Sequence, residues 1–135
     1  MFYNLLDECI NYITRELIAL VNRIPTPFSY SSAVVAGEYV FIGLHRGFGE
    51  TFTQQIHDTF EHLNKTLLQC NVALDNVVKV NLYLKNINDL PEMEKVFCDY
   101  FETGRFPARM TTTTEFIDSD CLMMIDGVAY NPFSQ

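Results

Sequence analysis

The chain has 135 residues and a mass of 15.6 kDa, which is enough for one domain and too little for two. With 48% hydrophobic and 19% charged residues, its composition is that of a globular protein and excludes a disordered one. The formal net charge is −8 and the nine cations are dispersed, which argues against binding to a nucleic-acid backbone. A small anionic ligand held by one arginine is compatible with this charge.

The sequence predicts a soluble, cytoplasmic protein with no membrane partner. No apolar run reaches the roughly 18 residues that span a bilayer, and Asp7 and Glu8 occupy the region where a signal peptide is positive. The cysteines form no close pair and have apolar neighbours, which predicts reduced, mostly buried thiols and no metal site. These cysteines are Cys9, Cys70, Cys98 and Cys121.

An amphipathic helix is predicted over residues 4–21, because apolar residues recur there at spacings of four and three. This stripe consists of Leu6, Ile10, Ile13, Leu17 and Leu20. Asn22 and Pro25 are expected to end the helix, with an extended connector at Pro25-Thr26-Pro27. We therefore divide the chain into a helical extension over 1–24 and one domain over 25–135.

The next elements are a hairpin and a second helix. Strand-forming residues between 28 and 42 flank Gly37, which can supply the backbone freedom of the turn. After a glycine-rich loop, Thr51 and Gln54 form a capping-box pair that begins a helix, and Asn71 is expected to close it in a left-handed conformation. The predicted buried stripe of this helix is Phe52, Ile56, Phe60, Leu63 and Leu67.

Residues 77–85 alternate like a half-covered strand. The residues predicted on its inner face are Val78, Val80, Leu82 and Leu84. A third helix is expected from Asp89, and strands are expected over 109–116 and 121–130. This order predicts an α+β fold with a mixed sheet. The last strand is apolar on both faces, so one face must meet the N-terminal helix or another subunit, and we predict an oligomer.

Most polar residues have an ordinary structural interpretation. His57 and His62 lie five residues apart on one helix and point about 140° apart, so they cannot share a metal ion. His45 in the glycine-rich loop either lines a site or has no role in one. Asp118 and Asp120 fit a hairpin turn better than a pair of catalytic carboxylates.

Arg109 is the most interesting cation, because it follows Phe106-Pro107-Ala108 and begins a strand. An arginine in that place can present its planar guanidinium group to a carboxylate. The alternative is an ordinary solvated surface arginine.

Several motifs, in this order and spacing, resemble the Rid/YjgF family of reactive-intermediate deaminases, also described as the endoribonuclease L-PSP family. The stretches are 74–80, 84–89, the Phe106-Pro107-Ala108-Arg109 step, the 35–41 hairpin, Tyr30 and Gln54. The resemblance covers about residues 25 to 130. It implies a chorismate-mutase-like α+β fold, with a mixed sheet packed on two helices, and a homotrimer with ligand clefts between subunits. The activity it implies is hydrolysis of imines and enamines, without metal or cofactor, to ammonia and a 2-keto acid.

The resemblance also implies site residues. Arg109 matches the arginine that binds the substrate carboxylate, and Tyr30 matches the tyrosine of the cleft. The family usually has a serine before a glycine at the end of the second strand. Here that strand ends Ile42-Gly43, so the serine is missing.

Two further positions depart from the family pattern. Glu94 stands where a cleft asparagine is expected, and it would either repel an anionic ligand or pair with Arg109. Met124 stands where the family has the glutamate associated with water activation, which a methionine cannot perform. Asp126 is on the same strand face, about 7 Å further along, and is the candidate replacement.

Three functions follow from this resemblance. The first is deamination of small 2-imino and enamine acids such as 2-iminobutanoate and 2-iminopropanoate. The second is non-catalytic binding of a small carboxylate metabolite, which the methionine at position 124 motivates. The third, an endoribonuclease, is disfavoured by the acidic net charge and the dispersed cations.

Overall fold

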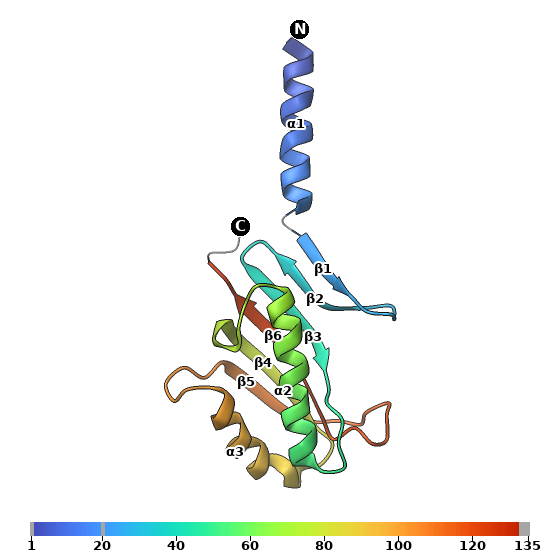
Figure 1. The fold of residues 1–135 in the computed structure, drawn as a ribbon, viewed down its shortest axis with the longest axis vertical. Helices are drawn as coiled ribbons and strands as arrows, with labels where there is room; N and C mark the ends of the chain where they lie inside the picture. Colours follow the sequence, from blue (N-terminus) through green and yellow to red (C-terminus); the bar gives the residue numbers. More distant parts are fainter. Residues whose placement is uncertain (1, 20, 133–135) are drawn as a thin grey trace.

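The computed structural model describes residues 2–19 and 21–132, which form an α+β structure (Figure 1). The helices and strands are α1 (Phe2–Ala19), β1 (Val21–Pro25), β2 (Ser31–Ala36), β3 (Tyr39–His45), α2 (Phe52–Gln69), β4 (Val77–Leu84), α3 (Leu90–Tyr100), β5 (Ala108–Thr113) and β6 (Met123–Tyr130). The described strands form one six-stranded sheet in the order β1-β2-β3-β6-β4-β5. The predicted fold class is confirmed, with α2 and α3 on one face of the sheet.

The sheet is mixed because one strand pair is parallel. β4 and β5 run in the same direction, whereas the other described pairs are antiparallel. A parallel pair needs a crossover connection, and α3 provides it between β4 and β5. This crossover brings α3 over the edge strand that carries Arg109.

The first helix begins and ends two residues earlier than predicted, and an unpredicted strand follows it. Val21–Pro25 forms β1, which pairs antiparallel with β2, so the expected helix end and connector are wrong. The β-branched Val21 and Ile24 favour an extended backbone. Pro25 is tolerated because it ends an edge strand at the point where the pairing with β2 shifts.

The apolar stripe of α1 is uncovered. The side chains of Leu6, Ile10 and Ile13 are 60%, 53% and 56% exposed. Leu20 and the side chain of Leu17 lie outside the described residues. Figure 1 shows α1 projecting from the sheet beyond β1, so it does not cover the sheet face opposite α2 and α3. No helix in the described ranges is long and apolar enough to cross a membrane.

The hairpin and the second helix agree with prediction. Gly37 turns between β2 and β3 with a φ of 61°. Thr51 and Gln54 make both hydrogen bonds of the capping box of α2, and Asn71 follows the C-cap with a φ of 59°. Every residue of the predicted stripe is buried, namely Phe52, Ile56, Phe60, Leu63 and Leu67.

An irregularity near the start of β4 reverses part of its predicted pattern. Val77 is buried and Val78 is 47% exposed, because the pairing with β6 shifts between Val77 and Lys79. Val78 was therefore wrongly expected inside. At the same place a Cβ atom on Gly127 of β6 would lie 2.2 Å from the Lys79 carbonyl oxygen. The predicted inner residues beyond the irregularity are buried, namely Val80, Leu82 and Leu84.

The two faces of β6 have different surroundings. On the face toward the helices, the apolar side chains of β6 are fully buried. They are Met123, Ile125 and Ala129. The opposite face, which we call the open sheet face, is covered by no described helix. Its exposed apolar side chains include Phe41 at 50% and Met110 at 54%. The predicted start of β6 at Cys121 is two residues too early, because the Leu122 N–H is bonded to the Gln55 side chain at 2.9 Å instead of to a strand.

Only two of the four thiols are buried. Cys70 and Cys121 lie inside, as predicted, and burial raises the pKa of both. Cys9 and Cys98 are exposed, which contradicts the expectation of mostly buried cysteines. Cys98 follows the buried Phe97 on α3 and turns toward solvent at the edge of a pocket.

Candidate functional site

Arg109 lies near the start of the edge strand β5, at a pocket of about 330 Å³ between β5 and α3. The residues around this pocket, which we call the arginine pocket, are Glu94, Phe97, Cys98, Phe106, Pro107 and Arg109. The proline fixes the backbone just before β5, and the crossover helix α3 supplies the other wall. The pocket is therefore built from a short stretch of chain on either side of one turn.

The Arg109 guanidinium group is held by two neighbours. Its central carbon lies 4.8 Å from the centre of the Phe97 ring, which is the geometry of a cation–π contact. One of its nitrogens forms an ion pair with Glu94. The Arg109 side chain is 23% exposed and that of Glu94 is 51% exposed. Of the two alternatives for Glu94, the structure has the one in which it pairs with Arg109.

Asp126 lies on the open sheet face within a small polar cluster. The Asn81 side-chain amide donates to one Asp126 oxygen at 2.8 Å, and the Tyr83 hydroxyl donates to the other at 3.3 Å. Burial raises the pKa of Tyr83, and the negative charge and hydrogen bond of Asp126 raise it further. Tyr83 thus stays protonated as a donor. Met124 is the direct partner of Tyr83 across the β4–β6 ladder.

Within the chain, Arg109 and Asp126 point to opposite faces of the sheet. Arg109 pairs with Val80 on β4, which is buried under the helices, and its guanidinium group contacts α3. Asp126 pairs with Asn81, the next residue of β4, and bonds to its side chain on the open face. Successive residues of a strand alternate faces, so one chain alone does not bring these two side chains together.

Tyr30 lies at the other side of the sheet. It immediately precedes β2, and its exposed ring stacks on Phe28 with centroids 6.0 Å apart. The strands β3, β6 and β4 lie between β2 and β5, which separates Tyr30 from Arg109 by roughly 19 Å across the sheet. Gly43 is near Tyr30 in β3, and a Cβ atom there would lie 3.1 Å from the Ser31 carbonyl oxygen.

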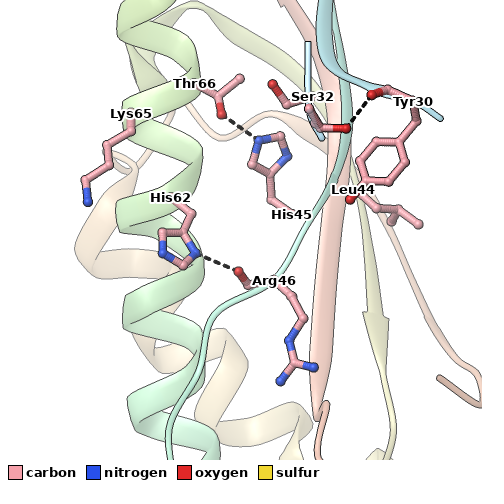
Figure 2. A pocket seen from close by; sticks show the side chains of 9 residues that line it. Tyr30, Ser32, Leu44, His45, Arg46, His62, Lys65 and Thr66 are labelled. Atoms are coloured by element: carbon pink, nitrogen blue, oxygen red, sulfur yellow. Dashed lines mark hydrogen bonds between the residues drawn. The ribbon is translucent and has the colours of Figure 1, made fainter. Parts of the chain in front are cut away.

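A second pocket, of about 340 Å³, opens beside Tyr30 between β3 and α2 (Figure 2). His45 lies at its wall as the last residue of β3 and not in the loop, and it is 7% exposed. Its Nδ1 is 2.7 Å from the Gly43 carbonyl oxygen, and its Nε2 is 2.8 Å from the Thr66 hydroxyl. Burial lowers the pKa of His45, and nearby His62 lowers it further. Both ring nitrogens are engaged, which fits a structural histidine.

Sequence reasoning missed an ion-pair cluster at Arg46. Its side chain, 12% exposed, contacts Asp118 at 3.2 Å and Asp120 at 3.4 Å, and its guanidinium carbon lies 4.3 Å from the centre of the Phe48 ring. The Arg46 hydrogen bond holds the pKa of Asp120 below its ordinary value. The two carboxylates thus tie the loop before β6 to the end of β3. No spacing pattern reveals a contact between residues more than 70 positions apart.

The described residues contain no group of three or more histidine, cysteine or acidic side chains that could hold a metal ion. His57 and His62 have separate partners. The first lies 2.7 Å from the Tyr100 hydroxyl, and the second lies 2.8 Å from the Arg46 carbonyl oxygen.

Comparison with known proteins identifies the family. Residues 21–131 match the family model described as Endoribonuclease L-PSP. The chain belongs to this family, which is also called YjgF or RutC. A RutC family protein of Pyrococcus horikoshii is 31% identical over 125 residues, covering 86% of this chain and 98% of the relative. The match to the family model begins at residue 21, the first residue of β1, so α1 lies outside that match.

Two further L-PSP family relatives are informative. A protein of Dermatophagoides farinae named 2-iminobutanoate/2-iminopropanoate deaminase is 28% identical over 113 residues, covering 77% of this chain and 88% of the relative. A crystal structure of a YjgF family member from Neisseria meningitidis superposes with a TM-score of 0.78 at 25% identity, covering 82% of this chain and 94% of that one. The structure thus has the chorismate-mutase-like fold of the family, as predicted.

Proposed function

We propose that this L-PSP family protein binds a small carboxylate-bearing metabolite in a cleft between subunits and hydrolyses 2-imino and enamine acids to 2-keto acids and ammonia. The observation that carries the proposal is Arg109, held over the Phe97 ring at the mouth of the arginine pocket. A guanidinium group fixed in this way can bind a carboxylate through two parallel hydrogen bonds. The name of the Dermatophagoides farinae relative supports the reaction class.

The cleft requires more than one subunit. Tyr30 lies near one edge of the sheet and Arg109 lies on the strand at the other edge, so the two can meet only when neighbouring copies bring unlike edges together. The open sheet face supports the same assembly, because its exposed residues include Phe41 and Met110. We propose a homotrimer in which Tyr30 and Asp126 of one subunit face Arg109 of the next.

The oligomer has its own test. Light scattering at micromolar concentration should give the mass of a trimer, and Phe41→Lys should dissociate it because the substitution places a charge on the open sheet face. The control is Leu68→Lys, since Leu68 is 69% exposed on the outer side of α2. A monomeric wild-type protein would contradict the trimer.

In the proposed reaction, Asp126 accepts a proton from water as the water oxygen attacks the imine carbon. The same carboxyl group then gives this proton to the nitrogen. As the C–N bond breaks and ammonia leaves, the Asp126 carboxylate takes the remaining hydroxyl proton, the carbonyl forms, and the proton passes to solvent. Asn81 and Tyr83 hold the carboxylate with one hydrogen bond each. Positioned proton transfer of this kind accelerates a reaction by about 10²- to 10⁴-fold.

The activity is tested by measuring ammonia release from freshly generated 2-iminobutanoate. The wild-type protein should accelerate release over buffer, and Arg109→Ala should abolish the effect. Arg105→Ala is the matched control, because Arg105 is 59% exposed, pairs with Asp75 and does not line the arginine pocket. No acceleration by the wild-type protein would refute the deaminase proposal.

Met124 favours a second candidate, a non-catalytic binding protein that uses the same cleft. Met124 shares the open sheet face with Asp126 but carries no group that can transfer a proton. If this candidate is correct, the wild-type protein binds a carboxylate without turnover and Met124→Glu gains deaminase activity. Robust activity in the wild-type protein would exclude it.

A further inference from the structure

We propose that Arg109 and Glu94 act together as a recognition site for a zwitterionic head group, with the ligand carboxylate on Arg109 and a protonated ligand nitrogen on Glu94. The inference rests on the proposed function only in taking Arg109 as the carboxylate anchor. It adds a second recognition element and names the ligand class as 2-amino or 2-iminio acids.

The geometry of α3 places both partners of Arg109 on one side of the helix. Glu94 and Phe97 are three residues apart, so they project from the same face toward β5. Phe97 lies against the flat face of the guanidinium group and Glu94 bonds to one of its nitrogens. A carboxylate bound to the remaining N–H groups would therefore lie next to the Glu94 oxygens.

The charges of the arginine pocket cancel. Its other lining residues carry no formal charge and are Phe97, Cys98, Phe106 and Pro107. For a ligand with a negative charge and no positive one, the Arg109 charge is already balanced by Glu94. Such a ligand must bind beside the Glu94 carboxylate, which repels it, or displace that carboxylate from Arg109. A zwitterion meets both charges with their opposites. Since Glu94 is 51% exposed, it can turn to a ligand without leaving a buried position.

This pairing distinguishes the proposed substrate from its product. A 2-iminio acid carries a positive nitrogen beside its carboxylate, whereas the 2-keto acid left after hydrolysis carries the carboxylate alone. Glu94 would hold the first and oppose the second. The site would thus favour substrate entry and product release, and a free 2-amino acid would compete with the substrate.

The test compares two ligands that differ only in the charged nitrogen, L-alanine and propanoate. Their dissociation constants are measured by calorimetry or NMR titration with the full-length protein and with Glu94→Gln. We expect the wild-type protein to bind alanine more tightly. In Glu94→Gln the ratio of the two constants should shift toward propanoate by about three- to tenfold. Glu102→Gln is the control, because it removes the same charge from an exposed position outside the pocket.

The ratio of two constants in one sample does not depend on the folded fraction, so a destabilised variant still gives an answer. An unchanged ratio in Glu94→Gln, or a wild-type preference for propanoate, would overturn the inference. If propanoate binding is nevertheless lost in Arg109→Ala, the carboxylate anchor stands and only the role of Glu94 fails. If neither ligand responds to Arg109→Ala, the anchor fails as well and the inference falls with it.

Discussion

The Tyr83 hydroxyl donates a hydrogen bond of 3.3 Å to the Asp126 carboxylate on the open sheet face. Met124 lies opposite Tyr83 in the β4–β6 ladder, so a glutamate substituted at position 124 would lie beside the same tyrosine. The acidic group at this place on β6 is therefore Asp126, and it accepts hydrogen bonds from two side chains of β4, Asn81 and Tyr83.

We predict that Asp126→Asn lowers kcat for 2-iminobutanoate by about 10²- to 10⁴-fold, because it removes the proton-transfer group while retaining the shape of the side chain. KM should change little, since Arg109 still holds the carboxylate. Tyr83→Phe should cost less, because Asn81 still bonds to Asp126. Steady-state kinetics measures both effects. Tyr39→Phe, on a different part of the sheet, should leave kcat unchanged, and an active Asp126→Asn enzyme would remove Asp126 from the mechanism.

Stability should fall as the pH drops below about 6.5, the ordinary pKa of histidine, and His45 should contribute to the fall. Burial lowers the pKa of His45 in the folded state. The unfolded chain therefore takes up a proton at a pH where the folded chain does not, and the stabilisation present above this value is lost below it. Urea unfolding between pH 7.5 and 5 measures the slope.

The control for this prediction is a pair of variants. His45→Gln should give a shallower pH slope than the wild type, whereas Leu68→Gln on the exposed side of α2, which removes no titratable group, should not change it. Equal slopes in the wild type and His45→Gln would show that the histidine is not kept neutral by folding.

Removing residues 1–20 should leave a folded domain, whereas removing residues 1–25 should destabilise it. The first deletion removes α1, which projects from the sheet. The second also removes β1 and exposes the edge of β2, whose backbone groups then lose their partners. Thermal unfolding and aggregation assays measure the difference. Equal stability of the two truncated chains would contradict a structural role for β1.

Arg46→Ala should loosen the loop over residues 114–122. The substitution removes the cation that joins Asp118 and Asp120 to the end of β3. We expect faster hydrogen exchange in that loop with little change in α3, as measured by mass spectrometry. Raising the salt concentration should weaken the same contacts in the wild type, because both carboxylates are exposed. Unchanged exchange in Arg46→Ala would mean that the hydrogen bonds of Gln55 and Lys85 to the loop are sufficient to hold it.

Local patterns in the sequence were sufficient for the hairpin at Gly37, the cap at Thr51 and the buried stripe of α2. These features depend on residues that are close in sequence. The strand β1 was missed because its pairing with β2 outweighs the helical pattern that runs up to it. The exposure of Val78 follows from a shift in pairing with β6, which no alternation of residues reveals.

For the candidate site, the sequence likewise predicted the residues but not their arrangement in space. Arg109, Tyr30 and Asp126 were identified by residue type and resemblance. Their separation onto two edges and two faces of the sheet depends on strand order, which the sequence does not state. The pairing of Glu94 with Arg109 was one of two alternatives, and the crossover of α3 over β5 decides it.

The absence of a side chain at Gly127 of β6 makes room for the irregular backbone of β4. A methyl group at this position would collide with the Lys79 carbonyl oxygen, so β4 can take its irregular path near Val77 only while position 127 lacks a side chain. In relatives aligned to this chain, we therefore expect a larger residue in that column to coincide with a regular β4. A single alignment column would then report a local feature of the backbone in proteins whose structures have not been solved.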